Sequence, residues 1–124
     1  MTMEKKYRLL EDETITIDGR TLYRIEALRD FADVKKGDKG GYIESEINLS
    51  HEGNCWVYDN ARVYDNAWVC DNALVCDNAR VFGNARVYGD ALVCDNARVF
   101  GNAWVSANAW VYGDAKVSGG NIRS

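Results

Sequence analysis

Valine recurs at every sixth position from Val57 to Val117, and alanine follows four residues after each of the first ten valines. Within a unit of the form Ala-x-Val-x the two apolar residues lie two positions apart, so in an extended strand their side chains point to the same side. The two remaining positions are mostly Asp-Asn, Gly-Asn or Gly-Asp, which tolerate turns and left-handed backbone conformations. The pattern therefore predicts hexads, each made of a four-residue strand and a two-residue corner.

The hexads predict a coil rather than a helix or a meander of hairpins. A period of six does not keep one face of an α-helix apolar. Strands of four residues are also too short to bury an apolar face by pairing only with their sequence neighbours. If each strand pairs with the equivalent strand one turn later, valine and alanine fill a narrow interior. We therefore expect an all-β fold, a short parallel β-helix.

The outward positions repeat every eighteen residues, which predicts three hexads per coil and three faces. The apolar face carries Trp56, Leu74, Leu92, Trp110, Tyr58, Cys76, Cys94 and Tyr112. The basic face carries Arg62, Arg80, Arg98 and Lys116, with Tyr64, Phe82 and Phe100 beside them. The third face places Arg86 between Trp68 and Trp104, which predicts a structural cation–π sandwich.

The first fifty residues lack the repeat and predict a cap. Residues 14–17 and 21–25 alternate as strands, and Asp18-Gly19 between them suits a type I′ hairpin turn. A glycine-rich loop then leads into the first coil. A cap of this kind would cover the unpaired backbone groups at the end of the coil. The expected organisation is a capping hairpin and loop in residues 1–50, the β-helix in residues 51–120 and a tail in residues 121–124.

The unit resembles the hexapeptide repeat of left-handed β-helix proteins, in which a small residue follows an aliphatic one four places on, with Gly-Asn or Asp-Asn between them. The resemblance implies a left-handed coil. The position after the aliphatic residue, usually small or acidic in that superfamily, is here mostly Tyr, Cys or Phe. The segment ALRDFADVKKGDKGGYIESEINLSHEGNCWVYDNA, followed by V-x-G-N-A units, resembles the YdcK-like group of phage-borne and bacterial β-helix proteins.

Composition narrows the class of protein. Apolar residues make up 47% of the chain, so disorder from low hydrophobicity is not expected. The net charge of −4 argues against a general nucleic-acid binder. No apolar run approaches the roughly 18 residues that a membrane span needs, so we expect no membrane partner. A cytoplasmic location is expected, which would be the host cytoplasm if the protein is phage-encoded.

The candidate catalytic chemistry rests on one histidine. The resemblance to hexapeptide-repeat acyltransferases implies a histidine base near a subunit groove, and His51 is the only histidine. A general base must lie beside the acceptor group. No loop interrupts the hexads between Val57 and Val117 to build an acceptor pocket. We therefore expect no catalytic residue and no cofactor, and acyl transfer is the alternative.

Metal binding is not expected from the sequence. None of the four cysteines, Cys55, Cys70, Cys76 and Cys94, forms a CxxC pair, and four reduced thiols are the expectation. One corner carries Asp59, Asp77, Asp95 and Asp114. A single-file column of carboxylates provides few oxygens that converge on one point, as Ca²⁺ requires. Solvated turn residues are the expected role of this corner.

The outward residues are sorted into a basic face and an apolar face, and each face predicts a binding partner. Like charges stacked about 4.8 Å apart repel one another unless an aromatic ring, an aspartate or an anionic partner compensates them. The basic face therefore predicts a strip that binds an acidic protein surface, with a nucleic-acid backbone less favoured by the net charge of −4. The apolar face is large for a monomer surface and predicts a homo-oligomer. Its nearly palindromic Trp-Leu-Leu-Trp order favours an antiparallel two-fold dimer.

The expected function is that of a non-catalytic binding protein. The resemblance implies that the protein is phage-encoded. The basic face predicts that it docks on a host protein, and the expected result is inhibition of a defence or nucleic-acid-processing enzyme. Two alternatives stay open. One is an acyltransferase-like protein that uses His51, and the other is a purely structural self-assembling element.

Overall fold

The computed structural model describes residues 5–123 and begins with an antiparallel hairpin. Its strands are β1 (Tyr7–Ile17) and β2 (Arg20–Ala27). Asp18 and Gly19 connect them with φ angles of 50° and 78°, and a type I′ turn requires positive φ at both positions. The predicted hairpin and its turn are therefore confirmed, with strands that extend further in both directions than the alternation indicated.

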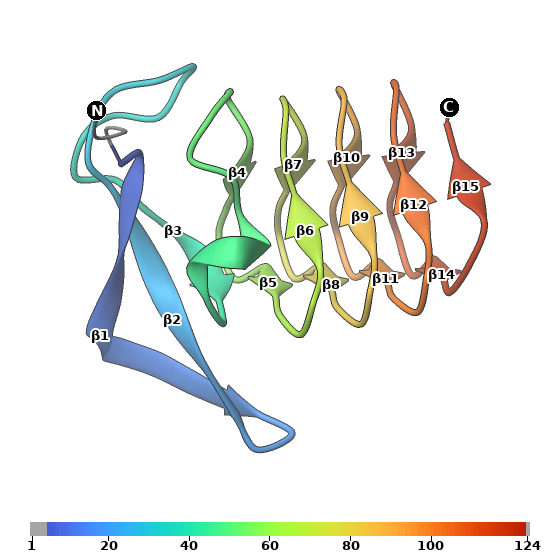
Figure 1. Ribbon diagram of the computed structural model, residues 1–124, viewed down its shortest axis with the longest axis horizontal. Helices are drawn as coiled ribbons and strands as arrows, with labels where there is room; N and C mark the ends of the chain where they lie inside the picture. The colour runs from blue at the N-terminus through green and yellow to red at the C-terminus, as the bar shows by residue number, and fades with distance from the viewer. Residues whose placement is uncertain (1–4, 124) are drawn as a thin grey trace.

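A three-sided parallel β-solenoid follows the hairpin (Figure 1). The chain passes through β3 (Lys39–Ile43) and a short 3₁₀ helix, η1 (Glu46–Asn48), before the repeats begin. The repeat strands are β4 (Trp56–Val57), β5 (Arg62–Val63), β6 (Trp68–Val69), β7 (Leu74–Val75), β8 (Arg80–Val81), β9 (Arg86–Val87), β10 (Leu92–Val93), β11 (Arg98–Val99), β12 (Trp104–Val105), β13 (Trp110–Val111), β14 (Lys116–Val117) and β15 (Asn121–Ile122).

Each face of the solenoid is one parallel sheet. The strand orders are β4-β7-β10-β13, β6-β9-β12-β15, and β1-β2-β3-β5-β8-β11-β14. Strands therefore pair with the third strand along the chain, which confirms three hexads per coil. The last sheet also joins the hairpin to the solenoid, because β3 pairs antiparallel with β2 and parallel with β5. The cap and the coils thus share one continuous hydrogen-bonded ladder.

The valine and alanine columns form the core, as predicted. Val63, Val81 and Val99 are register partners on successive coils, and each is fully buried. The assigned strands are two residues long rather than four, because the chain bends at every corner. Hydrogen bonds between coils nevertheless continue into the corners, where the Asn60 N–H donates to the Asp77 carbonyl over 3.1 Å.

The corner aspartates have a structural role that the turn pattern alone did not reveal. Asp59, Asp77 and Asp95 all have φ between 55° and 59°, in the left-handed region. The carboxylate of Asp59 accepts the N–H of Asp77, 3.2 Å away, and the carboxylate of Asp77 accepts the N–H of Asp95, 3.0 Å away. Each of these side chains therefore satisfies a backbone donor one coil further on, which explains why aspartate is preferred there.

The cap packs on the first coil through an aromatic cluster. The Trp56 side chain is 1% exposed, and its ring lies edge-on to Tyr7 and Phe31 with centroid distances of 6.2 and 5.1 Å. The buried Lys6 ammonium donates to the Cys55 carbonyl, 2.7 Å away. Gly41 in β3 lets the backbone of the cap approach the first coil closely.

In the part of the chain that the structure describes, no helix is long and apolar enough to cross a membrane.

Candidate binding faces

The basic face is a column of cations held in register by the sheet. Arg62, Arg80, Arg98 and Lys116 are successive partners in β5, β8, β11 and β14. Within residues 5–123 none of these four side chains forms a salt bridge. A hollow of about 290 Å³ on this face is lined by Arg62, Asn78, Arg80, Asn96 and Arg98. The face therefore presents uncompensated positive charge beside neutral amide groups.

The aromatic residues beside these cations stack on one another. Tyr64 and Phe82 are parallel with ring centroids 5.1 Å apart, and Phe82 and Phe100 repeat the same 5.1 Å spacing. No cation–π contact joins these rings to the basic column within the described range 5–123. The structure thus stacks these rings on one another rather than on the arginines.

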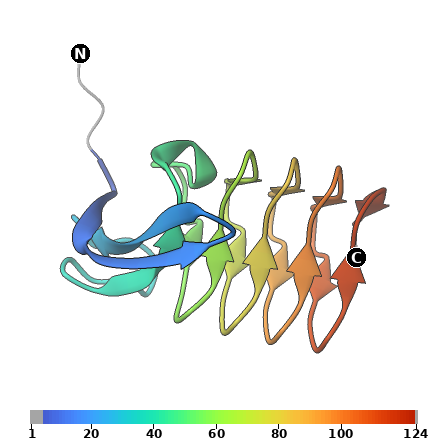
Figure 2. The same ribbon diagram turned by 90° about the horizontal axis from the view of Figure 1, so that it is seen from below.

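Tyr64 differs from the expectation that it lines an exposed binding strip. Its side chain is 4% exposed, and burial raises its pKa above the usual value. The hairpin lies alongside the first coil (Figure 2), and Arg20 beside the hairpin turn pairs with Asp65 at 2.6 Å. The cap therefore accounts for the lost exposure of Tyr64, and the accessible aromatic part of the strip begins with Phe82.

The exposed part of the apolar face is shorter than the row of residues that the sequence assigns to it. Trp56 was expected at an exposed interface, but the cap covers it. Leu74 and Leu92 are half-buried, while Trp110 and Tyr112 are 60% and 57% exposed and pack against each other with centroids 5.1 Å apart. The Trp-Leu-Leu-Trp palindrome therefore does not exist on the surface, because only one of its two tryptophans is accessible.

The other residues of the apolar face are partly covered. The Tyr58 hydroxyl donates to Asp33 in the cap loop over 2.8 Å, and the tyrosine is half-buried. Cys94 is 7% exposed, since the Trp110 indole N–H donates to its sulfur over 3.2 Å. Cys76 is half-buried on the coil before it. All four cysteines are free thiols.

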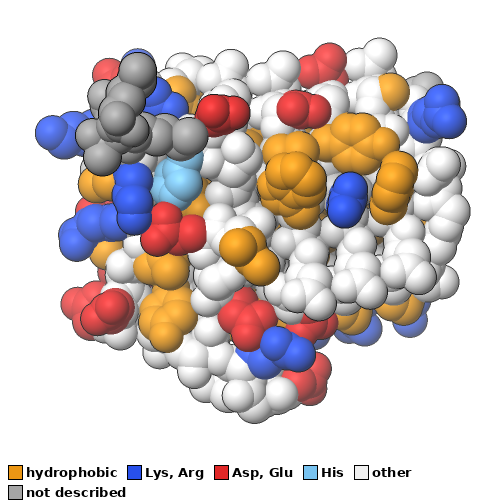
Figure 3. All heavy atoms as spheres, in the orientation of Figure 1, with side chains coloured by type: hydrophobic (Ala, Val, Ile, Leu, Met, Phe, Trp, Pro, Cys, Tyr) orange, Lys and Arg blue, Asp and Glu red, His pale blue; other side chains and the backbone are white. Residues whose placement is uncertain are grey.

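The third face contains the predicted cation–π sandwich. The Arg86 guanidinium lies 5.6 Å from the Trp68 ring centroid and 5.4 Å from that of Trp104. Figure 3 shows this face, where hydrophobic side chains gather around a cation over β6, β9 and β12. Arg86 is thus compensated within the chain, unlike the arginines of the basic face.

His51 is engaged on both ring nitrogens. Its Nδ1 accepts the Lys6 backbone N–H at 3.1 Å, and its Nε2 lies 2.7 Å from a Glu46 carboxylate oxygen. The ring also stacks on Tyr7 with centroids 4.1 Å apart. The hydrogen bond with His51 lowers the pKa of Glu46 below its usual value. In this arrangement the imidazole ties the cap to the first coil and has no nitrogen directed at a substrate.

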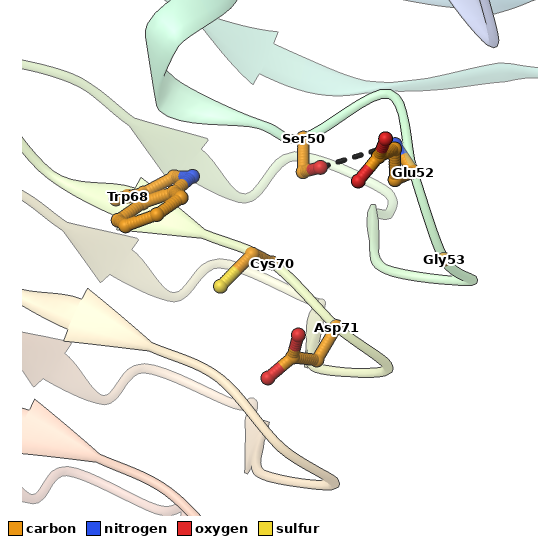
Figure 4. Close-up of a pocket in the computed structure, with 6 residues that line it drawn as sticks. All are labelled: Ser50, Glu52, Gly53, Trp68, Cys70 and Asp71. Carbon is orange, nitrogen blue, oxygen red and sulfur yellow. Dashed lines mark hydrogen bonds between the residues drawn. The ribbon is translucent and has the colours of Figure 1, made fainter.

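A hollow of about 330 Å³ at the junction of cap and coil was not anticipated from the sequence (Figure 4). Its lining consists of Ser50, Glu52, Gly53, Trp68, Cys70 and Asp71. Burial raises the pKa of Cys70 to about 11, so its thiol stays protonated near neutral pH and is a poor nucleophile. The feature of the sequence that could have located this hollow is the interruption of the hexads at Gly53, where φ is 71°.

These observations define a capped parallel β-solenoid with three chemically distinct faces. Residues 57–71, 73–89, 79–95 and 91–107 match the pattern described as the YdcK Beta solenoid repeat. The matches lie in the coils, and the cap built from β1 to β3 lies outside them. The coils of this chain are therefore similar to that repeat over the matched residues.

The chain is also similar to a protein of Escherichia coli (strain K12) named "Uncharacterized acetyltransferase YdcK". The two are 44% identical over an alignment of 62 residues that covers 44% of this chain and 19% of that protein. The chain thus matches less than a fifth of the length of this relative. The name of the relative assigns an acetyltransferase activity to that protein and not to this chain.

Proposed function

We propose that this protein is a non-catalytic binding protein whose basic face docks on an acidic surface of a host protein. Its setting would be that of a phage-encoded inhibitor of a defence or nucleic-acid-processing enzyme. The observation that carries the proposal is the cation column of β5, β8, β11 and β14, which has no acidic partner within residues 5–123. The same chain compensates other cations, such as Arg86, through aromatic rings.

Electrostatics favour an anionic partner for this column. Two unit charges about 4.8 Å apart repel each other by about 0.9 kcal/mol in water, and by more near a low-dielectric surface. An acidic partner removes this repulsion and adds attraction, which raises the association rate as well as the affinity. A protein surface fits better than duplex nucleic acid, because the strip is short and the whole chain carries a net charge of −4.

A charge-reversal capture experiment tests this face. Tagged wild-type protein and the variant Arg80→Glu/Arg98→Glu are used to capture proteins from a nuclease-treated bacterial lysate. We expect the wild type to retain a near-stoichiometric protein that elutes with rising salt, and the variant to lose at least 90% of it. Salt sensitivity is expected because exposed charges are screened within about 8 Å at physiological ionic strength.

Lys35→Glu/Lys36→Glu is the matched control. It changes the net charge by the same amount, and both lysines are exposed in the cap loop. This variant should capture as much as the wild type. Equal capture by Arg80→Glu/Arg98→Glu, or equal loss in the control, would show that the basic face does not select the partner.

We further propose that the apolar face mediates a homodimer, with Trp110 and Tyr112 at its centre. These neighbouring rings are the most exposed large aromatic side chains of the described chain. Trp110→Gln/Tyr112→Gln is expected to lower the mass measured by sedimentation velocity from dimer to monomer. Trp68→Gln/Trp104→Gln removes two exposed aromatics from another face and should leave the dimer intact. A wild type that sediments as a monomer at all accessible concentrations would refute this interface.

Acyl transfer is the second candidate, supported by the name of the Escherichia coli relative. Its only histidine base would be His51, whose two nitrogens already face the Lys6 N–H and Glu46. A general base needs a free nitrogen within reach of the acceptor. The binding proposal therefore requires fewer changes of the structure than the catalytic one.

A further inference from the structure

The solenoid brings Cys76 and Cys94 together on the apolar face although eighteen residues separate them in the chain. Each follows the buried valine of its hexad, and the two valines, Val75 and Val93, are register partners in β7 and β10. The sulfur atoms lie within 4.8 Å of each other. A regular coil therefore produces a dithiol that the absence of a CxxC motif concealed.

We propose that Cys76 and Cys94 form a binding site for a soft monovalent cation, Cu(I), held between two thiolates. Thiolate ligands select Cu(I) over hard cations. A metal ion midway between two sulfurs, with bonds of about 2.3 Å as found for zinc thiolates, needs the sulfurs about 4.6 Å apart. The two sulfurs lie within 4.8 Å of each other, a bound that includes this separation.

The side chains around the Cys76 and Cys94 sulfurs favour a metal site with two ligands rather than four. Asp77 is the nearest further candidate, with a carboxylate oxygen 4.0 Å from the Cys76 sulfur. That same oxygen accepts the Asp95 backbone N–H at 3.0 Å, so the corner ladder already holds it. Structural zinc sites use four ligands in a tetrahedron. A two-thiolate site that lacks two of those ligands suits Cu(I), which accepts two-coordinate geometry.

The neighbouring side chains act on a bound anionic complex in opposite directions: the Trp110 N–H favours it, whereas burial and the Asp77 carboxylate raise the pKa of Cys76 and oppose it. Binding replaces two thiol protons by one Cu(I): the protons leave to solvent, two S–Cu bonds form, and no electron is transferred. The site changes from neutral to a net charge of −1. The Trp110 indole N–H already donates to the Cys94 sulfur over 3.2 Å, and such a donor stabilises a thiolate. Cys94 is 7% exposed and Cys76 is half-buried, so the ion would enter from the Cys76 side.

Competition with a coloured Cu(I) chelate under anaerobic, reducing conditions tests the site. The full-length wild type should remove one equivalent of Cu(I) from the bicinchoninate complex. Cys76→Ser and Cys94→Ser should each weaken the uptake at least tenfold. X-ray absorption of the loaded protein should show two sulfur neighbours. No uptake by the wild type, undiminished uptake by both variants, or a site with four ligands would overturn the proposal.

Cys70→Ser is the matched control, because Cys70 occupies the same hexad position on the third face, where its neighbour one coil on is Tyr88. It should bind Cu(I) as the wild type does, and an equal loss in this variant would indicate non-specific thiol binding instead. Serine already occupies the position in Ser106 and Ser118, so these variants are expected to fold. Circular dichroism checks this, and Cys76→Ala and Cys94→Ala replace any serine variant that fails.

Discussion

Trp56→Ala is expected to lower the free energy of unfolding by about 3–5 kcal/mol, the usual range for a buried large aromatic residue. Its side chain is 1% exposed and packs edge-on against Tyr7 and Phe31 from the cap. Truncation would leave a cavity between cap and coil that neither side can close, because both are fixed by the shared ladder through β3. Urea unfolding monitored by circular dichroism measures the change.

Trp110→Ala is the matched control for this prediction. Trp110 occupies the same hexad position in the same sheet, three coils further on, but it is 60% exposed. At concentrations where the protein sediments as a monomer, we expect a loss of at most about 1 kcal/mol, as is usual for surface substitutions that remove a partial contact. Equal losses in the two variants would mean that the cap does not cover Trp56 in solution.

The contrast between these two tryptophans shows what the sequence could and could not predict. The period of six fixes side-chain direction, and the period of eighteen fixes which hexads are neighbours. Both are local regularities, so the buried valines, the three faces and the Arg86 sandwich could be predicted. The hairpin could also be predicted, because Asp18-Gly19 is a strong local turn signal.

The interactions of the cap could not be predicted in the same way. Trp56 and Tyr64 have the same pattern as exposed residues of later coils, and only contacts with residues far along the chain bury them. Tyr7 reaches Trp56 across almost fifty residues that carry no repeat. The two engaged nitrogens of His51 depend on the same docking. A pattern of single positions contains no information on such long-range packing. The exposure of the candidate site residues nearest the cap therefore could not be predicted.

The docking of the cap leads to a second large effect, at Gly41. A Cβ atom there would lie 2.5 Å from the Ala61 carbonyl oxygen and 2.7 Å from a Val57 methyl group. The same carbonyl accepts the Tyr42 N–H at 2.9 Å, one of the bonds that join β3 to the first coil. Gly41→Ala must therefore displace the ladder itself, and we expect a loss of about 3 kcal/mol, at the upper end for overpacking.

Gly119→Ala provides the comparison, since a Cβ atom at Gly119 has no neighbour within 4 Å among residues 5–123 and the residue lacks a left-handed φ. Its unfolding free energy should stay within about 0.5 kcal/mol of the wild type. In Gly41→Ala the amide hydrogen of Tyr42 should also exchange faster than those of the later coils, because the strain acts where cap and coil join. A Gly41→Ala protein as stable as Gly119→Ala would show that β3 is not seated on β5, and the burial of Trp56 and Tyr64 would then lose its explanation.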